Sequence, residues 1–276
     1  MRPARAVAAA KINLALVVGE RRADGLHEVA SVLQRIDLCD RLELEPAPQL
    51  TVQGFRDDTI VGRALRELAL EADVHPGWRV RIAKEIPVAA GLGGGSADAA
   101  AALGLANAAL DRPLVPERLR ALAAALGADV PFFLEPGPKL AEGAGERLEP
   151  LELPQDFWVL LALPRDARKQ STAEVYARFD DLGNASGFAE RRKALLAGVA
   201  SVRRPRDLAA LPPNDLAEAG GGSALAAELR AAGAFRADLS GAGPAVYGLF
   251  HRREHARAAA RALGRRARTW IVAPVW

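Results

Sequence analysis

The chain is poor in cysteine and histidine. Cys39 is its only cysteine, which rules out an internal disulfide and with it the class of disulfide-stapled secreted domains. The four histidines show no pairing with cysteines at the spacing of a zinc site. The apolar start before Lys11 is too short for a signal peptide or a membrane-spanning helix. We therefore expect a cytoplasmic protein with no membrane partner.

An excess of charge of one sign is missing as well. The 37 basic and 34 acidic residues leave a formal net charge of +3. Arginine pairs occur at 203–204, 252–253 and 265–266, but each lies beside an alanine-rich helical pattern and is explained more simply as a solvated helix face. The balance argues against a nucleic-acid partner. With 50% hydrophobic residues, the 276-residue chain has enough apolar side chains for one large domain or two ordinary ones.

Two common phosphate-binding fingerprints are absent, since no Gly-Lys-Ser/Thr follows a glycine cluster and G-x-G-x-x-G does not occur. The chain instead has Pro-Val-Ala-Ala-Gly-Leu-Gly-Gly-Gly-Ser-Ala-Asp-Ala-Ala at 87–100. The glycines at 91 and 93–95 lack a Cβ, so the backbone can take positive φ and turn its N–H groups toward one point. Ser96 is expected to open a helix whose first turn attracts an anion. A flexible linker is the alternative, but apolar strand and helix patterns flank this stretch.

Strand and helix patterns alternate along the chain, and the composition changes near residues 150–154. Apolar alternation predicts strands at 15–18, 42–44, 78–82, 157–163, 237–239, 245–250 and 269–272. Helical spacing predicts helices at 59–72, from the glycine stretch to 110, and at 116–126, 171–179, 188–199, 225–232 and 253–263. We expect a mixed α+β fold with two domains, 1–152 and 153–276.

Lysine is rare, at five of the 37 basic residues, and Lys11 lies inside an apolar N-terminal segment. In Ala-Lys11-Ile-Asn13-Leu, strand alternation puts Lys11 and Asn13 on one face and their apolar neighbours on the other. Two polar groups would then project together, as in a binding site. An exposed polar pair on an edge strand is the alternative.

A polar turn, Asp24-Gly-Leu-His27, precedes the apolar run that begins at Val29. Gly25 is free to take positive φ there, which would place His27 where its ring or backbone faces a ligand. A lone histidine after a turn often has no such role, so this signal is weak by itself.

Two further segments complete the set of candidate groups. Asp129 lies between Gly127, which ends a predicted helix, and an apolar run, where partial burial would shift the pKa of its carboxylate. The alternative is that Asp129 only forms hydrogen bonds within its own turn. Ser240-Gly-Ala-Gly-Pro begins a second glycine turn that enters a strand. It would either close over the first glycine stretch or form a tight hairpin. Together these groups suit phosphoryl transfer, which needs positioning and charge neutralisation more than covalent catalysis.

In their order along the chain and in their residues, these segments resemble the motifs of the GHMP kinase superfamily. Segments 87–100 and 240–250 resemble motifs shared across it, whereas Ala-Lys11-Ile-Asn13-Leu with Asp24-Gly-x-His27 is similar to the branch whose substrate is a cytidine diphosphate methylerythritol. Segments 126–133, 142–146 and 214–216 also look like that branch. The resemblance implies a two-domain GHMP fold with ATP and substrate in the cleft between the domains. It also implies transfer of the ATP γ-phosphate to the methylerythritol 2-hydroxyl, in the non-mevalonate route to isoprenoid precursors.

The resemblance further implies roles for individual residues. Asp129 would take or orient the hydroxyl proton, while Lys11 would favour the ionised carboxylate and neutralise charge on the transferred group. ATP would be held by Pro87, Val88, Ala89, Ala90, Gly91, Leu92, Gly93, Gly94, Gly95, Ser96 and Ala97, together with Lys84. The cytidine substrate would be held by Asn13, Leu26, His27, Thr172 and Tyr176.

Two positions depart from the family pattern. Leu26 stands where the family usually has a tyrosine that stacks on cytosine, so Tyr176 is the remaining aromatic and we expect weaker cytidine binding. Thr59 stands where an asparagine commonly lies near the adenine, so ATP affinity is expected to differ. Magnesium is expected with ATP. Ser96 and Glu142 are candidate ligands, and the sequence leaves the choice open.

Two other functions fit parts of the sequence. A GHMP kinase for another small alcohol, such as mevalonate or homoserine, would share both glycine motifs but should lack Asp24-Gly-x-His27. A nucleotide-binding module without catalysis is supported only by Leu26 and is opposed by Lys11 and Asp129. For the assembly we expect a monomer or a weak homodimer.

Overall fold

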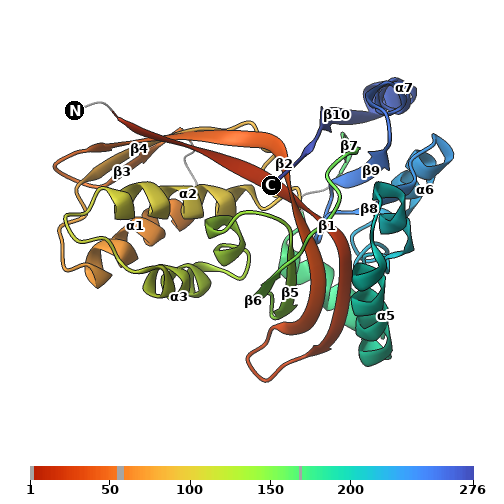
Figure 1. Ribbon diagram of the computed structural model, residues 1–276, viewed down its shortest axis with the longest axis horizontal. Helices are drawn as coiled ribbons and strands as arrows, with labels where there is room; N and C mark the ends of the chain where they lie inside the picture. The colour runs from red at the N-terminus through yellow and green to blue at the C-terminus, as the bar shows by residue number, and fades with distance from the viewer. Residues whose placement is uncertain (1–2, 55–58, 168–169) are drawn as a thin grey trace. The chain divides into compact units, whose positions relative to one another are not determined.

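The computed structural model describes residues 3–54, 59–167 and 170–276, which form two compact units (Figure 1). The first unit holds residues 3–10, 38–54, 59–88 and 93–136, and the second holds residues 11–37, 89–92, 137–167 and 170–276. Strands β1 (Ala4–Arg21) and β2 (His27–Pro46) pair with each other and contribute residues to both units. The glycine stretch is also shared, because residues 89–92 belong to the second unit and residues 93–97 to the first.

In the first unit, helices cover one side of a small sheet. The second half of β2 pairs antiparallel with β4 (Trp78–Ala83), and β3 (Thr51–Gln53) pairs parallel with β4. Helices α1 (Thr59–Glu71), α2 (Gly94–Ala108) and α3 (Pro116–Leu126) lie along these strands, and the short 3₁₀ helix η1 (Pro131–Leu134) follows (Figure 1). The alternating strand residues Leu42, Leu44, Val80 and Ile82 pack with Leu65, Leu68 and Leu103 of the helices.

In the second unit, the first half of β2 pairs with several strands. It lies antiparallel to β5 (Lys139–Gly143), which forms a hairpin with β6 (Arg147–Pro150), and β11 (Pro274–Val275) also pairs with β2. Helix α4 (Thr172–Asp181) packs Val175 and Phe179 against Leu16, Val18 and Val29 of β1 and β2. Helix α5 (Phe188–Ser201) and the 3₁₀ helix η2 (Pro205–Ala210) come next in the chain.

The second unit also contains an antiparallel sheet with the strand order β10-β7-β9-β8. Its strands are β7 (Trp158–Pro164), β8 (Arg236–Leu239), β9 (Val246–Phe250) and β10 (Ala267–Val272). Helices α6 (Ser223–Ala231) and α7 (Arg253–Leu263) pack Leu229, Ala256 and Leu263 against Leu160 and Val246, and η3 (Gly264–Arg266) leads into β10. Within the described ranges, no helix is long and apolar enough to cross a membrane.

Most of the expected elements are confirmed, and so is the mixed α+β class. Helices α1, α3 and α7 agree with the expected bounds to within one residue. The short strands expected at 15–18 and 42–44 are wrong in length, because they are parts of strands of 18 and 20 residues. Alanine has little strand propensity, and pairing with β2 overrides it along the alanine-rich start of β1. The domain boundary expected at residue 152 stays a prediction, and the side chain of Thr59 lies outside the described residues.

Candidate active site

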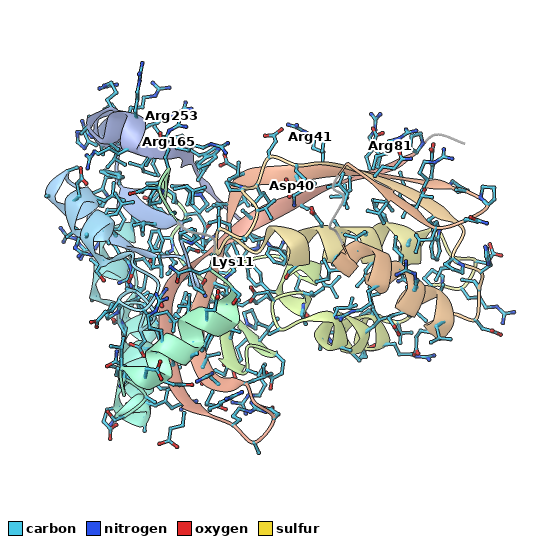
Figure 2. The ribbon with its side chains drawn as sticks, turned by 180° about the vertical axis from the view of Figure 1, so that it is seen from behind. Lys11, Asp40, Arg41, Arg81, Arg165 and Arg253 are labelled. Carbon is cyan, nitrogen blue, oxygen red and sulfur yellow. The ribbon has the colours of Figure 1, made fainter. Side chains whose placement is uncertain are left out.

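Lys11 and Asn13 form a buried polar pair on β1. Each is 4% exposed, and the Lys11 ammonium donates a 2.7 Å hydrogen bond to Asn13 Oδ1 (Lys11 is labelled in Figure 2). Asn13 Nδ2 donates to Ser31 Oγ at 2.8 Å, and that hydroxyl donates to the Ala15 carbonyl at 2.8 Å. The shared face predicted from strand alternation is confirmed, and an exposed edge pair is wrong. Because a buried ammonium needs polar partners, this pair is a candidate functional group.

Residues 89–92 of the glycine stretch are attached to the second unit through the backbone. The Lys11 N–H donates to the Leu92 carbonyl at 3.0 Å, and the Ala245 N–H donates to the Ala90 carbonyl at 3.1 Å. This part of the glycine stretch is therefore bonded to the backbone of the candidate lysine at Leu92, and to the end of the second glycine turn at Ala90.

Gly91 is in close contact with the second glycine turn. Its φ is 79°, and a Cβ at this position would lie 2.1 Å from the Ser240 carbonyl oxygen, so a side chain does not fit. Ser240 Oγ donates to the Gly91 carbonyl at 2.9 Å. The second turn thus packs on the first loop and also connects the antiparallel strands β8 and β9, so both of the alternatives considered for it hold.

Residues 93–97 form the beginning of α2 in the first unit. Gly93, at φ 70°, is the N-cap, and the Ala97 N–H donates to its carbonyl at 2.9 Å. The expectation that Ser96 opens the helix is wrong, because the helix begins at Gly94 and Ser96 lies within its first turn. Three flexible glycines in a row let the helix start earlier than a serine cap would. The positive end of the helix dipole is therefore presented by the glycine backbone.

The Lys84 ammonium lies between two buried carboxylates of the first unit. Its Nζ is 2.5 Å from Asp40 Oδ2 and 2.6 Å from Asp98 Oδ2, and both aspartates are 0% exposed. Asp40 Oδ1 also accepts the backbone N–H groups of Glu85 and Ile86, at 2.6 and 2.9 Å. Burial by itself lowers the pKa of Lys84, but the hydrogen bonds and charges of the two aspartates outweigh it and raise that pKa above its ordinary value. Lys84 therefore stays charged at neutral pH.

The cluster of Asp40, Lys84 and Asp98 connects β2, the end of β4 and the first turns of α2. A Cβ at Gly94 would lie 3.5 Å from Lys84 Nζ, so the ammonium is next to the first residue of α2. Sequence reasoning named only the lysine. A signal for Asp40 was present, because it interrupts the inward-facing apolar alternation of Leu38, Leu42 and Leu44. The neighbouring Arg41 points to the opposite, exposed face of the strand (Figure 2).

Asp129 belongs to the first unit and lies in the turn between α3 and η1. Helix α3 ends at Leu126 with Gly127 as its C-cap, and the Val130 N–H donates to the Gly127 carbonyl at 3.1 Å. Asp129 is half-buried, so its placement after a helix-ending glycine and its partial burial are confirmed. Lys11 belongs to the second unit, and its pairing with Asp129 remains a prediction.

The expected cytidine-binding residues lie at the start of β2 and on α4. His27 Nε2 is 2.7 Å from Asp180 Oδ1, and the His27 ring centroid is 4.8 Å from that of Tyr176, with planes tilted by 38°. Leu26 is 53% exposed, and Thr172 is the exposed first residue of α4. The structure thus brings His27 and Tyr176 into ring contact.

The turn before His27 has the geometry that its glycine predicts. Gly25 has φ 84°, its N–H donates to the Arg22 carbonyl at 3.0 Å, and the Arg22 N–H donates to the Leu26 carbonyl at 2.6 Å. Asp180, the partner of His27, was not predicted. Nothing in the sequence separates it from other acidic residues on a solvated helix face.

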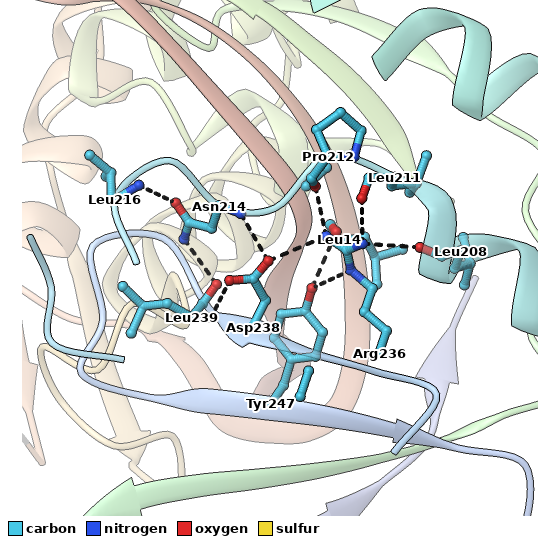
Figure 3. Close-up of polar contacts among 12 residues, drawn as sticks. Leu14, Leu208, Leu211, Pro212, Asn214, Leu216, Arg236, Asp238, Leu239 and Tyr247 are labelled. Carbon is cyan, nitrogen blue, oxygen red and sulfur yellow. Dashed lines mark hydrogen bonds and ion pairs between the residues drawn. The ribbon is translucent and has the colours of Figure 1, made fainter. Parts of the chain in front are cut away.

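A buried polar network lies behind the second glycine turn (Figure 3). Asp238 accepts the backbone N–H groups of Asn214 and Leu239 at 2.8 and 2.9 Å, and its Oδ2 is 3.3 Å from Arg236 Nη2. Burial raises the pKa of the Asp238 carboxyl, against the lowering effect of Arg236 and the two N–H donors. Donors from several segments thus oppose the effect of burial on this carboxyl group.

Tyr247 continues this network toward β1. Arg236 Nε donates to the Tyr247 hydroxyl, which donates to the Leu14 carbonyl, each at 3.2 Å. Complete burial raises the pKa of Tyr247 to about 12, so the hydroxyl remains a donor at neutral pH. β9 is in this way hydrogen-bonded to the strand that carries Lys11 and Asn13.

The two candidate magnesium ligands have different surroundings. Glu142 pairs with Arg192 at 2.5 Å, and Ser96 lies in the first turn of α2. Among the described residues, no group of three or more His, Cys, Asp or Glu side chains could hold a metal ion. A magnesium ion that keeps water and phosphate ligands needs few protein groups, so this arrangement fits one that arrives with a nucleotide.

Each unit contributes groups that suit a phosphorylated ligand. In the first unit, the N-terminus of α2 and the Lys84 ammonium favour an anion, and Asp129 offers a half-buried carboxylate. In the second unit, the Lys11 ammonium adds a positive charge.

Comparisons with known proteins extend over almost the whole chain. The family model described as the GHMP kinases N terminal domain matches residues 59–137, and the GHMP kinases C terminal model matches residues 223–268. A 4-diphosphocytidyl-2-C-methyl-D-erythritol kinase of Gloeobacter violaceus is 40% identical over 271 residues, which cover 94% of this chain and 89% of that protein. A crystal structure of a 4-(cytidine 5'-diphospho)-2C-methyl-D-erythritol kinase has a TM-score of 0.80 at 33% identity, covering 99% of this chain and 100% of that one. The mevalonate kinase of Methanococcus jannaschii, at 13% identity, TM-score 0.77 and 99% coverage of both chains, shares the fold.

Proposed function

Because this chain belongs to the GHMP kinases, and within them to the 4-diphosphocytidyl-2-C-methyl-D-erythritol kinases, we propose a role for each residue of its site in that reaction. The enzyme transfers the γ-phosphate of ATP to the 2-hydroxyl of its cytidine substrate, a step toward isoprenoid precursors. The observation that carries this conclusion is the identity of 40% with a named kinase over 94% of the chain.

We propose that Asp129 and Lys11 are the catalytic residues. The Asp129 carboxylate accepts the proton of the 2-hydroxyl as that oxygen bonds to the γ-phosphorus and ADP leaves with the electrons of the broken P–O bond. The Lys11 ammonium neutralises charge on the transferred phosphoryl group. In support, Lys11 is buried and is oriented by Asn13, which is itself held by Ser31.

ATP is held by residues 87–97 and Lys84 in this proposal. The backbone N–H groups around Gly91 and Gly93 and the first turn of α2 face the phosphates, where the helix dipole favours negative charge. Lys84 adds a positive charge at the first residue of α2, and Asp40 and Asp98 hold its ammonium in place. Ser96 would be the protein ligand of a magnesium ion bound with ATP, which would neutralise charge on the phosphates.

The cytidine substrate is held by Asn13, Leu26, His27, Thr172 and Tyr176. The His27 and Tyr176 rings form one aromatic surface, with Asp180 fixing His27 through its Nε2. Because Leu26 is exposed beside them and is aliphatic, the base is stacked by one aromatic partner and touched by an aliphatic one. We further propose a cytoplasmic location, which the single cysteine supports.

Replacing Leu26 with tyrosine is expected to tighten cytidine binding. An added aromatic wall contributes roughly 1 kcal/mol of stacking, which corresponds to a fall of about fivefold in the KM of the cytidine substrate with little change in kcat. Steady-state kinetics of the wild type and Leu26→Tyr measure this directly. Leu26→Met is the control, because it keeps an aliphatic side chain of similar size. An unchanged KM in Leu26→Tyr contradicts the assignment of Leu26 to the base.

The function itself is tested by ATP-dependent phosphorylation of 4-diphosphocytidyl-2-C-methyl-D-erythritol by the purified protein. Mevalonate and homoserine, tested in parallel, represent kinases that share the fold and act on another alcohol. Turnover of the cytidine substrate alone is the expected result. Turnover of either alternative alcohol would move the substrate assignment, and ATP binding without any turnover would favour a non-catalytic module.

A further inference from the structure

The second glycine turn lies directly against the Lys11–Asn13 pair. Gly241, at φ 55°, has no side chain, and a Cβ there would lie 3.4 Å from Asn13 Oδ1 and 3.5 Å from Lys11 Nζ. A side chain as small as a methyl group would therefore already touch both groups. The backbone of the turn thus lies close to the ammonium group and forms one wall around it. A shift of this wall would allow the ammonium to shift as well.

Asn214 holds this turn in place. Its Nδ2 donates to the Leu239 carbonyl at 2.9 Å, and its Oδ1 accepts the Leu216 N–H at 2.9 Å (Figure 3). The same Nδ2 donates to the Gly241 carbonyl at 2.7 Å. Its backbone N–H donates to Asp238 at 2.8 Å. The side chain thus uses both amide hydrogens and its oxygen, and the residue is 2% exposed.

The hydrogen bonds around Asn214 connect the turn to the rest of the unit. Asp238 is itself bonded to Arg236, and Arg236 donates to the backbone carbonyls of Leu208, Leu211 and Pro212. Such a fully bonded buried network is rigid. Loss of one donor leaves a buried carbonyl without a hydrogen bond, which costs free energy. The position of Gly241 is therefore set from behind by the Asn214 amide.

We propose that Asn214 is a positioning residue of the kinase: its side-chain amide fixes the Gly241 turn against Lys11 and Asn13, and thereby fixes the Lys11 ammonium where the phosphoryl group is transferred. This inference rests on the proposed catalytic role of Lys11. Asn214 acts through the turn, so its effect falls on turnover. Binding of the cytidine base, which depends on His27 and Tyr176, is left largely intact.

The substitution Asn214→Asp tests this with little change of shape. The new carboxyl can keep the bond from the Leu216 N–H, but it carries at most one proton, so at least one of the two carbonyls loses its donor. Since displacements near 1 Å at a catalytic group cost up to about 100-fold in rate, we expect kcat to fall by about 10-fold or more. The KM of the cytidine substrate should change much less than kcat, because the proposed base contacts of His27 and Tyr176 are not part of the turn.

Asn107→Asp is the matched control. Asn107 Nδ2 donates to the Leu114 carbonyl at 3.2 Å and its Oδ1 accepts the Leu114 N–H at 2.8 Å, so the substitution removes the same kind of bond after α2. It should lower Tm and leave kcat unchanged when both are measured well below the unfolding transition. If Asn214→Asp likewise lowers Tm and leaves kcat unchanged, its role is only structural and the inference is overturned.

A second variant covers the case in which Asn214→Asp does not fold. Gly241→Ala adds a Cβ at a left-handed backbone position, 3.3 Å from the Gly91 carbonyl oxygen and close to Asn13 and Lys11, which strains the turn while leaving the Asn214 side chain itself unchanged. A similar fall in kcat is expected, and an unchanged kcat overturns the inference. A wild-type protein without turnover would refute the proposed function instead. In that case the crystal structure of a folded Asn214 variant decides, since a Gly241 turn that stays in place contradicts the positioning role.

Discussion

Asp129→Asn is expected to lower kcat by about 10²- to 10⁴-fold, the range typical for the loss of a general base. Asparagine has nearly the shape of aspartate but cannot accept the proton of the 2-hydroxyl at neutral pH. The KM of ATP should change little, because the glycine stretch and the first turn of α2 carry the proposed phosphate contacts. Initial rates at saturating substrates, with nucleotide binding followed by calorimetry, measure both quantities.

The control for this variant is Asp111→Asn, which changes an exposed aspartate of the same unit in the loop after α2. It should keep the wild-type kcat and Tm. If Asp129→Asn retained more than about a tenth of the wild-type kcat, Asp129 would contribute too little to the rate to be the general base. Loss of ATP binding together with kcat would instead indicate a disturbed loop rather than a lost base.

Asp40→Ala is expected to destabilise the protein by roughly 3–5 kcal/mol, as is typical when one partner of a buried ion pair is removed. The substitution removes a carboxylate that is 0% exposed, together with its bonds to Lys84 and to the backbone N–H groups of Glu85 and Ile86. Asp98 still pairs with Lys84, so the loss is expected toward the lower end of that range. Urea denaturation at pH 7, followed by circular dichroism, measures the change.

The sign of the pH dependence follows from Lys84. Its pKa is raised in the folded state, so the stabilisation from the cluster is complete below the ordinary lysine pKa of 10.5 and is lost as the pH rises through the folded value. The wild type should therefore lose stability as the pH rises above 10.5, and Asp40→Ala should lose less stability over that range.

Asp37→Ala is the control on the same strand. Asp37 is exposed, and its Oδ1 accepts the Ala273 N–H at 2.8 Å, so its loss should cost only about 1 kcal/mol. Equal losses in Asp37→Ala and Asp40→Ala would contradict the importance assigned to the buried cluster. Because Lys84 lies beside the first residue of α2, Asp40→Ala should also raise the KM of ATP.

Local patterns were enough to locate most helices and strands. Helix α3 was predicted at the bounds that the structure has, because Pro116 starts it and Gly127 ends it, and both signals act within a few residues. The shared face of Lys11 and Asn13 was predicted for the same reason, since strand alternation is a local property of the backbone. The motif resemblance then assigned these local features to a kinase, in agreement with the relatives.

Features that depend on pairing between distant segments were not predictable in this way. The sequence indicated short strands around residues 15–18 and 42–44, whereas pairing between β1 and β2 extends both well beyond them. Ser96 was expected to open α2, but the helix begins at Gly94 with Gly93 as its N-cap, because the glycines allow a left-handed residue where the chain leaves Leu92. Neither outcome follows from propensity alone.

The sequence by itself thus determined the fold class, the glycine motifs, the family and the identity of the candidate catalytic groups. Only the tertiary structure decided that Lys84 pairs with Asp40 and Asp98, that Asn13 donates to Ser31, and that Asn214 donates to the Gly241 carbonyl. These contacts join residues between 14 and 44 positions apart in the chain. The physical reason is that motif and periodicity act over a few neighbouring residues, whereas a buried charge or amide finds its partners only when distant segments pack together.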